Sequence, residues 1–215
     1  MIIKRVQSRL QRYILGDDPV NSKYSFRKNR LKLCFNILQI TSNDSILDVG
    51  GNIYYWVGTG FEKNVTILNM QLPETLHNPF KWVQGDACAM SDFEVGSYDI
   101  VFSNSVIEHV GDFEKQKRMS QEVRRVGKKY WIQTPYRHFP IEMHFLIPFF
   151  QYLPKSKRKY IAKLYPFSFS KVFNLDTDYD LNHIWLLNKK NLKSLFPDSH
   201  IIEEKLFGFT KSLIA

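Results

Sequence analysis

The chain has 215 residues and a mass of 25.5 kDa, which is room for one substantial domain. Its 44% hydrophobic and 24% charged residues are typical of globular proteins and exclude a disordered chain. Only two cysteines occur, Cys34 and Cys88, so a disulfide scaffold and a zinc finger are excluded and a reducing compartment is expected. The longest apolar run, residues 141–150, contains Glu142 and His144 and is shorter than the roughly 18–20 residues of a membrane span. Because the first fifteen residues lack the apolar core of a signal peptide, we expect a cytoplasmic protein.

The net charge of +9 is unevenly distributed. Residues 1–40 carry nine basic and two acidic residues, and residues 151–171 carry six basic and no acidic residues. A basic surface of this kind either serves solubility or binds an anionic partner such as nucleic acid, phospholipid or a phosphorylated substrate.

The spacing of apolar residues predicts the elements in chain order. Apolar residues three to four apart predict a basic amphipathic helix over residues 3–13 and a second helix over residues 26–40. Short apolar or β-branched runs predict strands over residues 45–50, 65–69, 81–84, 97–102 and 130–134. Helices are predicted over residues 113–126, with Gly127 at the stop, and over residues 191–196; residues 200–206 and 209–214 predict a hairpin around Gly208.

Strands that alternate with helices predict an α/β fold, in which a mostly parallel sheet lies between helices and ends in a C-terminal antiparallel hairpin. No repeat or linker interrupts the chain, so we predict a single domain over residues 1–215. Its parts are basic helices (1–40), a core (44–134), a substrate-side insertion or lid (136–175), and a final helix and hairpin (189–215).

The loop after the first strand, Asp48–Asn52, contains two glycines, which allow the backbone to turn tightly and approach a ligand closely. The dinucleotide pattern GxGxxG fails here, because Asn52 and Tyr55 occupy its second and third glycine positions. The phosphate-binding P-loop also fails, since no Gly-Lys-Ser/Thr follows. A nicotinamide or nucleoside triphosphate site is therefore not supported.

Four segments of the chain resemble, in order and spacing, the class I S-adenosylmethionine-dependent methyltransferases, in particular the methyltransferase type 11 group. They are Ile46–Gly51, Thr66–Asn69, Gln84–Ala87 and Tyr98–Val110. The resemblance covers roughly residues 44–134, with a looser match at the C-terminal hairpin. It implies a Rossmann-like three-layer sandwich, S-adenosyl-L-methionine as the cofactor, and methyl transfer as the reaction.

The same resemblance implies that the loop after the first strand binds the methionine and ribose parts of the cofactor. Asp48, Gly50, Gly51 and Asn52 would line this part of the site. Asn69 stands where the family usually has an acidic residue that binds both ribose hydroxyls.

Four further residues are implied to complete the cofactor site. Asp86 would accept a hydrogen bond from the adenine amino group, and Ala87 would pack beside it. Asn104 and Ser105 would edge the pocket near the methyl group that is transferred.

The chain departs from the family pattern at three positions. Asn52 and Tyr54 stand where two glycines are expected, and Asn69 lacks the charge of the usual carboxylate. These departures leave open a binding or regulatory protein on a degenerate methyltransferase fold. Side chains of Tyr54 or Tyr55 in the cofactor pocket would support that alternative.

The insertion begins at the end of the fifth strand, beside the expected methyl group. Histidine titrates near neutral pH and can remove a proton from an acceptor hydroxyl, so His138, His144 and His109 are candidate bases. Glu142 is the candidate for orienting one of them. Glu142 and His144 alone are two ligands without a third of matching spacing, and we predict no metal site.

Nine aromatic and six basic side chains alternate through residues 145–173. They predict either a lid with solvated charges, a surface that contacts a membrane at its inner face, or an RNA-binding surface, which ranks last because no RNA-binding module is visible.

The leading hypothesis is O-methylation of a small-molecule or glycan- or lipid-linked acceptor, a class that the resemblance suggests. A nucleic-acid (RNA) methyltransferase is the second hypothesis. Asp180 and His183 are further residues that could face the acceptor.

Overall fold

The computed structural model describes residues 26–145, 147–164, 181 and 183–215. Contacts along the chain divide it into two units, residues 1–42 and 43–215, each described by itself below. In the first unit, helix α2 (Phe26–Leu38) confirms the helix expected over residues 26–40. The helix expected over residues 3–13 lies outside the described residues, and the single domain over 1–215 stays a prediction.

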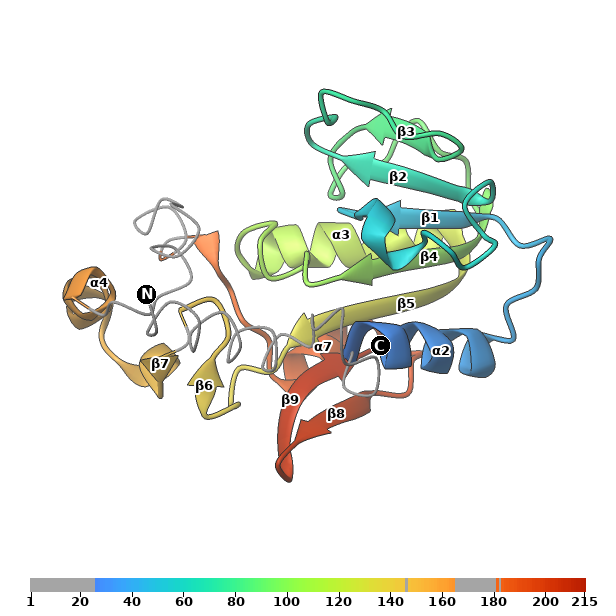
Figure 1. Ribbon diagram of the computed structural model, residues 1–215. Helices are drawn as coiled ribbons and strands as arrows, with labels where there is room; N and C mark the ends of the chain where they lie inside the picture. Colours follow the sequence, from blue (N-terminus) through green and yellow to red (C-terminus); the bar gives the residue numbers. More distant parts are fainter. Residues whose placement is uncertain (1–25, 146, 165–180, 182) are drawn as a thin grey trace, which may run out of the picture. The chain divides into compact units, whose positions relative to one another are not determined.

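The second unit is built on a seven-stranded sheet (Figure 1). Its elements in chain order are β1 (Ile46–Val49), η2 (Ile53–Tyr55), β2 (Val65–Asn69), β3 (Lys81–Gln84), β4 (Tyr98–Asn104), α3 (Phe113–Val126), β5 (Gly127–Pro135), β6 (Ile141–Glu142), β7 (Ile147–Pro148), η3 (Phe150–Tyr152), α4 (Lys155–Leu164), α7 (Lys189–Leu195), β8 (Ile202–Leu206) and β9 (Phe209–Ile214). The strand order is β3-β2-β1-β4-β5-β9-β8. Strands β1 to β5 are parallel, whereas β9 runs antiparallel to both β5 and β8. The predicted mostly parallel α/β fold with a terminal hairpin is therefore confirmed.

Strand β1 lies in the interior of the sheet, and all four of its residues are buried. Its neighbours are β2 on one side and β4 on the other, so the chain order of the strands reverses at β1. In an open parallel sheet, such a reversal leaves a crevice beyond the carboxyl ends of the strands, where ligands bind. The functional site is therefore expected where β1, β2, β3 and β4 end.

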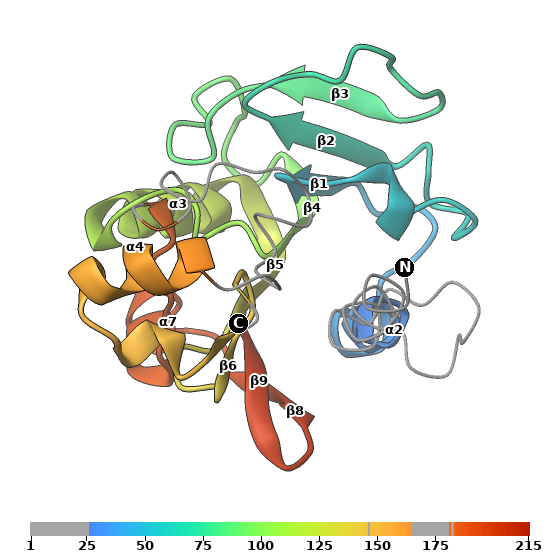
Figure 2. The ribbon, with the colours of Figure 1, turned by 60° about the vertical axis from the view of Figure 1, so that its left-hand side comes forward.

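Helices α3 and α7 cover one face of this sheet (Figures 1 and 2). Met119 and Val123 of α3 and Leu192 of α7 are fully buried in the same apolar cluster as Val101 of β4. Asp112 caps α3 by accepting a hydrogen bond from the backbone N–H of Lys115, as aspartate commonly does at this position.

Gly127 ends α3 as predicted, but the chain passes directly into β5, which begins three residues earlier than the strand predicted over residues 130–134. The backbone of Gly127 is extended, with φ −97°, and not left-handed. A Cβ atom there would lie 2.6 Å from Val101 Cγ2, so glycine is required for the close approach of the chain to β4.

The described part of the insertion departs from the strand–helix alternation, as expected. It contains the two-stranded β6–β7 sheet, η3 and α4, and it has a small apolar cluster of its own. Phe145, Ile147, Phe150 and Ala162 form that cluster. Among the described helices, none has the length and apolarity needed to cross a membrane.

Candidate functional site

The loop after β1 has the tight geometry that its glycines predict. Gly50 is left-handed, with φ +68°, and a Cβ atom there would lie 2.5 Å from Val106 Cγ2. A Cβ atom on Gly51 would overlap the carboxyl group of Asp48. Both glycines are therefore required by the local packing, and the backbone of this loop stays accessible at the end of β1.

Asp48 lies beneath this loop and is only 1% exposed. Its Oδ2 accepts a hydrogen bond of 2.7 Å from the indole Nε1 of Trp56, which is fully buried. Burial raises the pKa of Asp48 to about 7, against the opposing effects of the Trp56 indole and the backbone N–H of Asn52. In this structure Asp48 stabilises the loop through its contacts with Trp56 and Asn52. A direct contact with the cofactor stays a prediction.

The two unexpected residues of the loop occupy positions that do not require glycine. Asn52 has an extended backbone (φ −137°), and its side chain caps η2 by accepting from the N–H of Tyr54 at 3.1 Å. The side chain of Tyr54 is 79% exposed to solvent. Tyr55 packs against Phe102 of β4, with ring centroids 5.6 Å apart. The departures at 52 and 54 therefore leave the turn at Gly50 intact.

The ends of β2 and β3 bring two more predicted residues to the same edge of the sheet. The Nδ2 of Asn69 donates to the Gly51 carbonyl at 3.1 Å, which ties the end of β2 to the glycine loop. Asp86 follows β3 and is exposed; its Oδ1 accepts from the backbone N–H of Cys88 at 2.8 Å. Ala87 is 9% exposed and belongs to the core beside Asp86.

Asn104 and Ser105 lie at the end of β4, as predicted. Ser105 is left-handed (φ +56°), and its Oγ donates to Oε1 of Gln133 in β5 at 3.0 Å. The strained backbone of a non-glycine residue is thus held by a neighbouring strand. Sequence reasoning did not single out Gln133, because its role depends on the pairing of β4 with β5.

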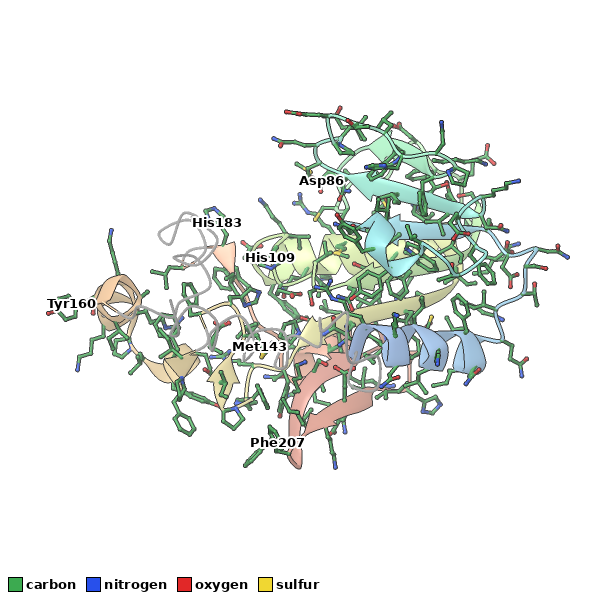
Figure 3. The ribbon with its side chains drawn as sticks, viewed as in Figure 1. Asp86, His109, Met143, Tyr160, His183 and Phe207 are labelled. Atoms are coloured by element: carbon green, nitrogen blue, oxygen red, sulfur yellow. The ribbon has the colours of Figure 1, made fainter. Side chains whose placement is uncertain are left out.

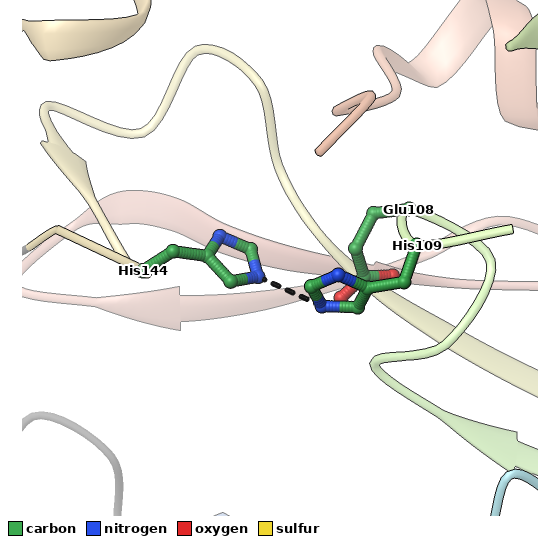
Figure 4. Close-up of side chains that lie close together, drawn as sticks. All are labelled: Glu108, His109 and His144. Carbon is green, nitrogen blue, oxygen red and sulfur yellow. Dashed lines mark hydrogen bonds between the residues drawn. The ribbon is translucent and has the colours of Figure 1, made fainter. Parts of the chain in front are cut away.

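Two of the three candidate bases, His109 and His144, meet beyond the carboxyl end of β4, where Figure 3 labels His109. His109 follows β4, and His144 lies between β6 and β7 in the insertion. Their Nε2 atoms are 3.1 Å apart, and the rings meet edge to face at 83° (Figure 4). The structure therefore joins the core and the insertion at this pair of imidazoles.

Glu142, the candidate for orienting a histidine, contacts His144. This carboxylate is 4% exposed, and its Oε1 lies 2.8 Å from His144 Nδ1. Its Oε2 accepts from the backbone N–H groups of His144 and Phe145 at 2.9 and 2.7 Å. The carboxylate fixes both the ring and the turn that carries it, so His144 Nε2 is directed at His109.

Glu108 is a residue of this cluster that was not among the predicted site residues. It is fully buried, and its Oε2 accepts from Thr134 Oγ1 at 3.0 Å. The other oxygen, Oε1, has no hydrogen-bond partner among the described atoms. The sequence could have indicated Glu108, because it is an acidic residue that directly precedes the candidate base His109 and follows a strand.

The environment changes the acid–base properties of this cluster. Neighbouring protein atoms shield the His109 ring from water and so disfavour its charged form, and the charge of the His144 ring acts in the same direction. Together they lower the pKa of His109 to about 4. Burial raises the pKa of Glu108 to about 7, with Glu142 adding a smaller contribution in the same direction. His109 is therefore uncharged at neutral pH, and perturbed groups of this kind are typical of functional sites.

His138 lies in a different setting from the other two histidines. It is exposed, and its Nδ1 is 2.8 Å from the hydroxyl of Tyr152. Its ring also contacts Tyr136, with centroids 5.2 Å apart. Its role as a base stays a prediction; His183 is exposed, and Asp180 lies outside the described residues.

A cavity of about 220 Å³ adjoins Glu142 on the side of the insertion. It is lined by both charged and aromatic side chains, including Arg137, Glu142, Phe150, Arg158 and Trp185. Arg158 donates from Nε to the Leu153 carbonyl and from Nη2 to the Gln151 carbonyl, each at 2.7 Å, and Glu142 is a carboxylate in the same lining, so the cavity carries charges of both signs.

Alanine at Gly50 should show whether the glycine loop is as constrained as the structure indicates. Gly58 is also left-handed, with φ +78°, but nothing lies within 4 Å of its Cβ position. We expect both alanine variants to lose about 1 kcal/mol of unfolding free energy from the backbone, and Gly50→Ala to lose about 1–3 kcal/mol more from the clash with Val106. Chemical denaturation of the two variants checks this, and equal losses would contradict the geometry at Gly50.

Comparison with known proteins agrees with this architecture. Residues 56–130 match the family model of a methyltransferase domain of type 11. A comparison with curated protein sequences finds no match.

Similar solved structures show the same fold. A SAM-dependent methyltransferase from Archaeoglobus fulgidus is 15% identical, with a TM-score of 0.52 over 83% of this chain and 73% of its own. Phosphoethanolamine N-methyltransferase 2 of Haemonchus contortus, solved with S-adenosyl-L-methionine, is 15% identical with a TM-score of 0.53 over 89% of this chain. The CurJ carbon methyltransferase is 10% identical with a TM-score of 0.56 over 97% of this chain. This chain spans 40% of the N-methyltransferase and 57% of the carbon methyltransferase.

The family match covers residues 56–130, and the similar solved structures share the fold that the resemblance to class I S-adenosylmethionine-dependent methyltransferases implies. The structurally similar proteins are named for transfer to nitrogen and to carbon, so the fold by itself does not select the acceptor atom.

Proposed function

We propose that the chain transfers a methyl group from S-adenosyl-L-methionine to an oxygen of a small-molecule or glycan-type acceptor. The observation that supports this best is the convergence of a constrained glycine loop and a carboxylate-oriented histidine pair at one edge of the sheet. The first is suited to the cofactor and the second to removing a proton from an acceptor hydroxyl.

The residues at the ends of β1 to β3 fit the cofactor. The Gly50–Gly51 backbone allows a carboxylate or a ribose to approach closely, and Asn69 Oδ1 can accept from a ribose hydroxyl. Asp86 uses Oδ1 for its own turn, and its Oδ2 can accept from an exocyclic amine. When bound, S-adenosyl-L-methionine supplies a methyl group on a positively charged sulfur and leaves as a neutral thioether.

On the acceptor side, the chain would have to place a hydroxyl beside the histidine pair and keep water away from it. His144 is the better candidate for receiving the proton, because Glu142 fixes its Nδ1 and stabilises the protonated ring; its Nε2 would exchange the contact with His109 for one with the acceptor. His109 then lies where it can orient the acceptor or share the proton.

Asp86→Asn tests the adenine assignment without disturbing the turn. Asparagine keeps an oxygen for the N–H of Cys88, but its amide nitrogen cannot accept from the adenine amino group. We expect S-adenosylhomocysteine to bind about 10-fold more weakly, with unchanged thermal stability. Asp92→Ala, another exposed aspartate, is the control, and unchanged affinity in Asp86→Asn would remove the assignment.

We further propose that the insertion contacts an anionic membrane surface. Phe149, Tyr152 and Tyr160 are 60%, 52% and 68% exposed, and the exposed Lys157 and Lys159 accompany them. Aromatic rings at the headgroup level and lysines beside anionic lipids are typical of peripheral membrane proteins.

Exchanging Lys157 and Lys159 for serine should lower the affinity for phosphatidylserine-containing vesicles, measured by co-sedimentation, about 30-fold, since each lysine is worth about 1 kcal/mol near such a surface. The exchange of Lys189 and Lys190 on α7 is the matched control. Equal binding of the two double variants would contradict the proposal, and loss of RNA binding alone would favour an RNA acceptor.

A further inference from the structure

We infer that Glu108, His109 and His144 form a binding site for one divalent first-row transition-metal ion, with Zn²⁺ as the best fit. One carboxylate oxygen and one ring nitrogen of each histidine lie within 4.8 Å of one another. The three residues come from the end of β4 and from the insertion, so the ion would link the core to the substrate side (Figure 4). The inference rests on the proposed function for its role in catalysis, but the binding itself can be tested separately.

The distance between the two imidazoles suits two ligands of one ion. At a metal–nitrogen distance of about 2.1 Å, ring nitrogens 3.1 Å apart subtend an angle of about 95° at the metal. This value lies between octahedral and tetrahedral geometry. A carboxylate oxygen of Glu108 lies within 4.8 Å of both ring nitrogens, close to the roughly 4.2 Å that two such bonds can span, so the carboxylate can complete the set.

Contacts behind the ligands match those of known metal centres. His144 is held through Nδ1 by Glu142, a carboxylate–histidine pair that orients Nε2 and raises its basicity as a ligand. Glu108 is held through Oε2 by Thr134. Its Oε1 is buried without a hydrogen-bond partner among the described atoms, an arrangement that is costly unless another group approaches it.

The donor set selects the kind of ion. Two imidazole nitrogens and one carboxylate favour Zn²⁺ or a similar transition metal over Mg²⁺ and Ca²⁺, which prefer oxygen ligands. Two histidines and one glutamate are also a ligand set of catalytic zinc sites, which keep a position open for water or substrate. An acceptor hydroxyl in that open position would lose its proton to solvent more readily, because the ion lowers its pKa.

Titration with Co²⁺ tests the site, because a bound ion gives visible absorption bands without any need for turnover. The full chain, free of an affinity tag and dialysed against a chelator, should bind one Co²⁺ ion, and Zn²⁺ should displace it. We expect His144→Ala and His109→Ala each to weaken binding at least 100-fold, and Glu142→Gln about 10- to 100-fold. His138→Ala and His200→Ala are matched controls for the loss of a histidine and should leave the affinity unchanged.

The inference would be overturned if the unmodified chain bound no Co²⁺. It would also be overturned if the His144→Ala and His109→Ala variants bound Co²⁺ as tightly as the unmodified chain does. His109 is exposed, so its variant keeps the test valid even where His144→Ala does not fold. S-Adenosylhomocysteine is titrated into the same samples. Cofactor binding without metal binding would overturn this inference alone, and metal binding without cofactor binding would overturn only the proposed methyl transfer.

Discussion

Replacing His144 with alanine is expected to lower turnover about 100- to 10,000-fold while S-adenosylhomocysteine still binds. Two observations support this: Glu142 fixes the ring through Nδ1 at 2.8 Å, and the opposite nitrogen meets His109 at 3.1 Å. The two proposed roles of His144, proton acceptor and metal ligand, use the same second nitrogen and exclude each other, but loss of the ring abolishes either one. The loss should therefore fall on the chemical step and not on cofactor affinity.

The measurement is release of S-adenosylhomocysteine with an acceptor found by screening, together with calorimetric titration of the same variant. His200→Ala is the control, because this exposed histidine precedes β8, the edge strand of the sheet, and is not part of the candidate site. Turnover within a few-fold of the unmodified chain in His144→Ala would contradict the assignment. The same exchange at His138 then tests the remaining candidate base.

The second large effect is expected from Asp48→Asn, in the dependence of stability on pH. The folded pKa of Asp48 is about 7, whereas an aspartate in an unfolded chain titrates near 4. The folded state therefore holds a proton that the unfolded state releases, so stability is fully present below about pH 4 and is lost as the pH rises to 7 and above. This contribution amounts to at most about 4 kcal/mol.

Asparagine keeps an oxygen for the indole N–H of Trp56 but does not titrate. Between pH 5 and pH 8, the unfolding free energy of the unmodified chain should therefore fall more than that of Asp48→Asn. The expected difference between the two falls is on the order of 2–3 kcal/mol. Urea denaturation across this range measures the difference. If the unfolding free energies of the two proteins changed with pH in parallel, Asp48 would be ionised throughout this range. The indole contact would then offset the effect of burial on the pKa of Asp48.

Most of the sheet could be predicted from the sequence, because strands such as β1 and β2 are short apolar or β-branched runs followed by a glycine or a polar residue. Residues 46–49 and 65–69 are confirmed as strands, and the terminal hairpin around Gly208 is confirmed as well. The early start of β5 could not be predicted. It depends on the absence of a side chain at Gly127 next to Val101, a contact made only after folding.

The site was predictable where it follows from position along a strand, and less so where it depends on pairing between distant segments. Asp86 and Ser105 lie at strand ends, as expected. The contact of His109 with His144 spans 35 residues and depends on how the insertion folds back, so no local pattern indicates it. For the same reason, the two-ligand pattern Glu142–His144 could not indicate the grouping of Glu108, His109 and His144 from which we infer a metal site.

The departures at Asn52 and Tyr54 illustrate the limits of motif spacing. Glycine is expected at these positions by the family pattern, yet Asn52 is extended and Tyr54 faces solvent. Gly50, with φ +68° and a close contact to Val106, and Gly51, whose Cβ atom would overlap the Asp48 carboxyl group, are the positions of this loop that need glycine for a physical reason. The altered loop is therefore compatible with a cofactor site.

Calorimetric titration of the full chain with S-adenosylhomocysteine, with NAD as the control ligand, tests the central claim most directly. The proposed function predicts binding of one S-adenosylhomocysteine per chain in the micromolar range, and no binding of NAD. Absence of binding to either ligand would contradict it, and would indicate a methyltransferase fold that serves a non-catalytic role.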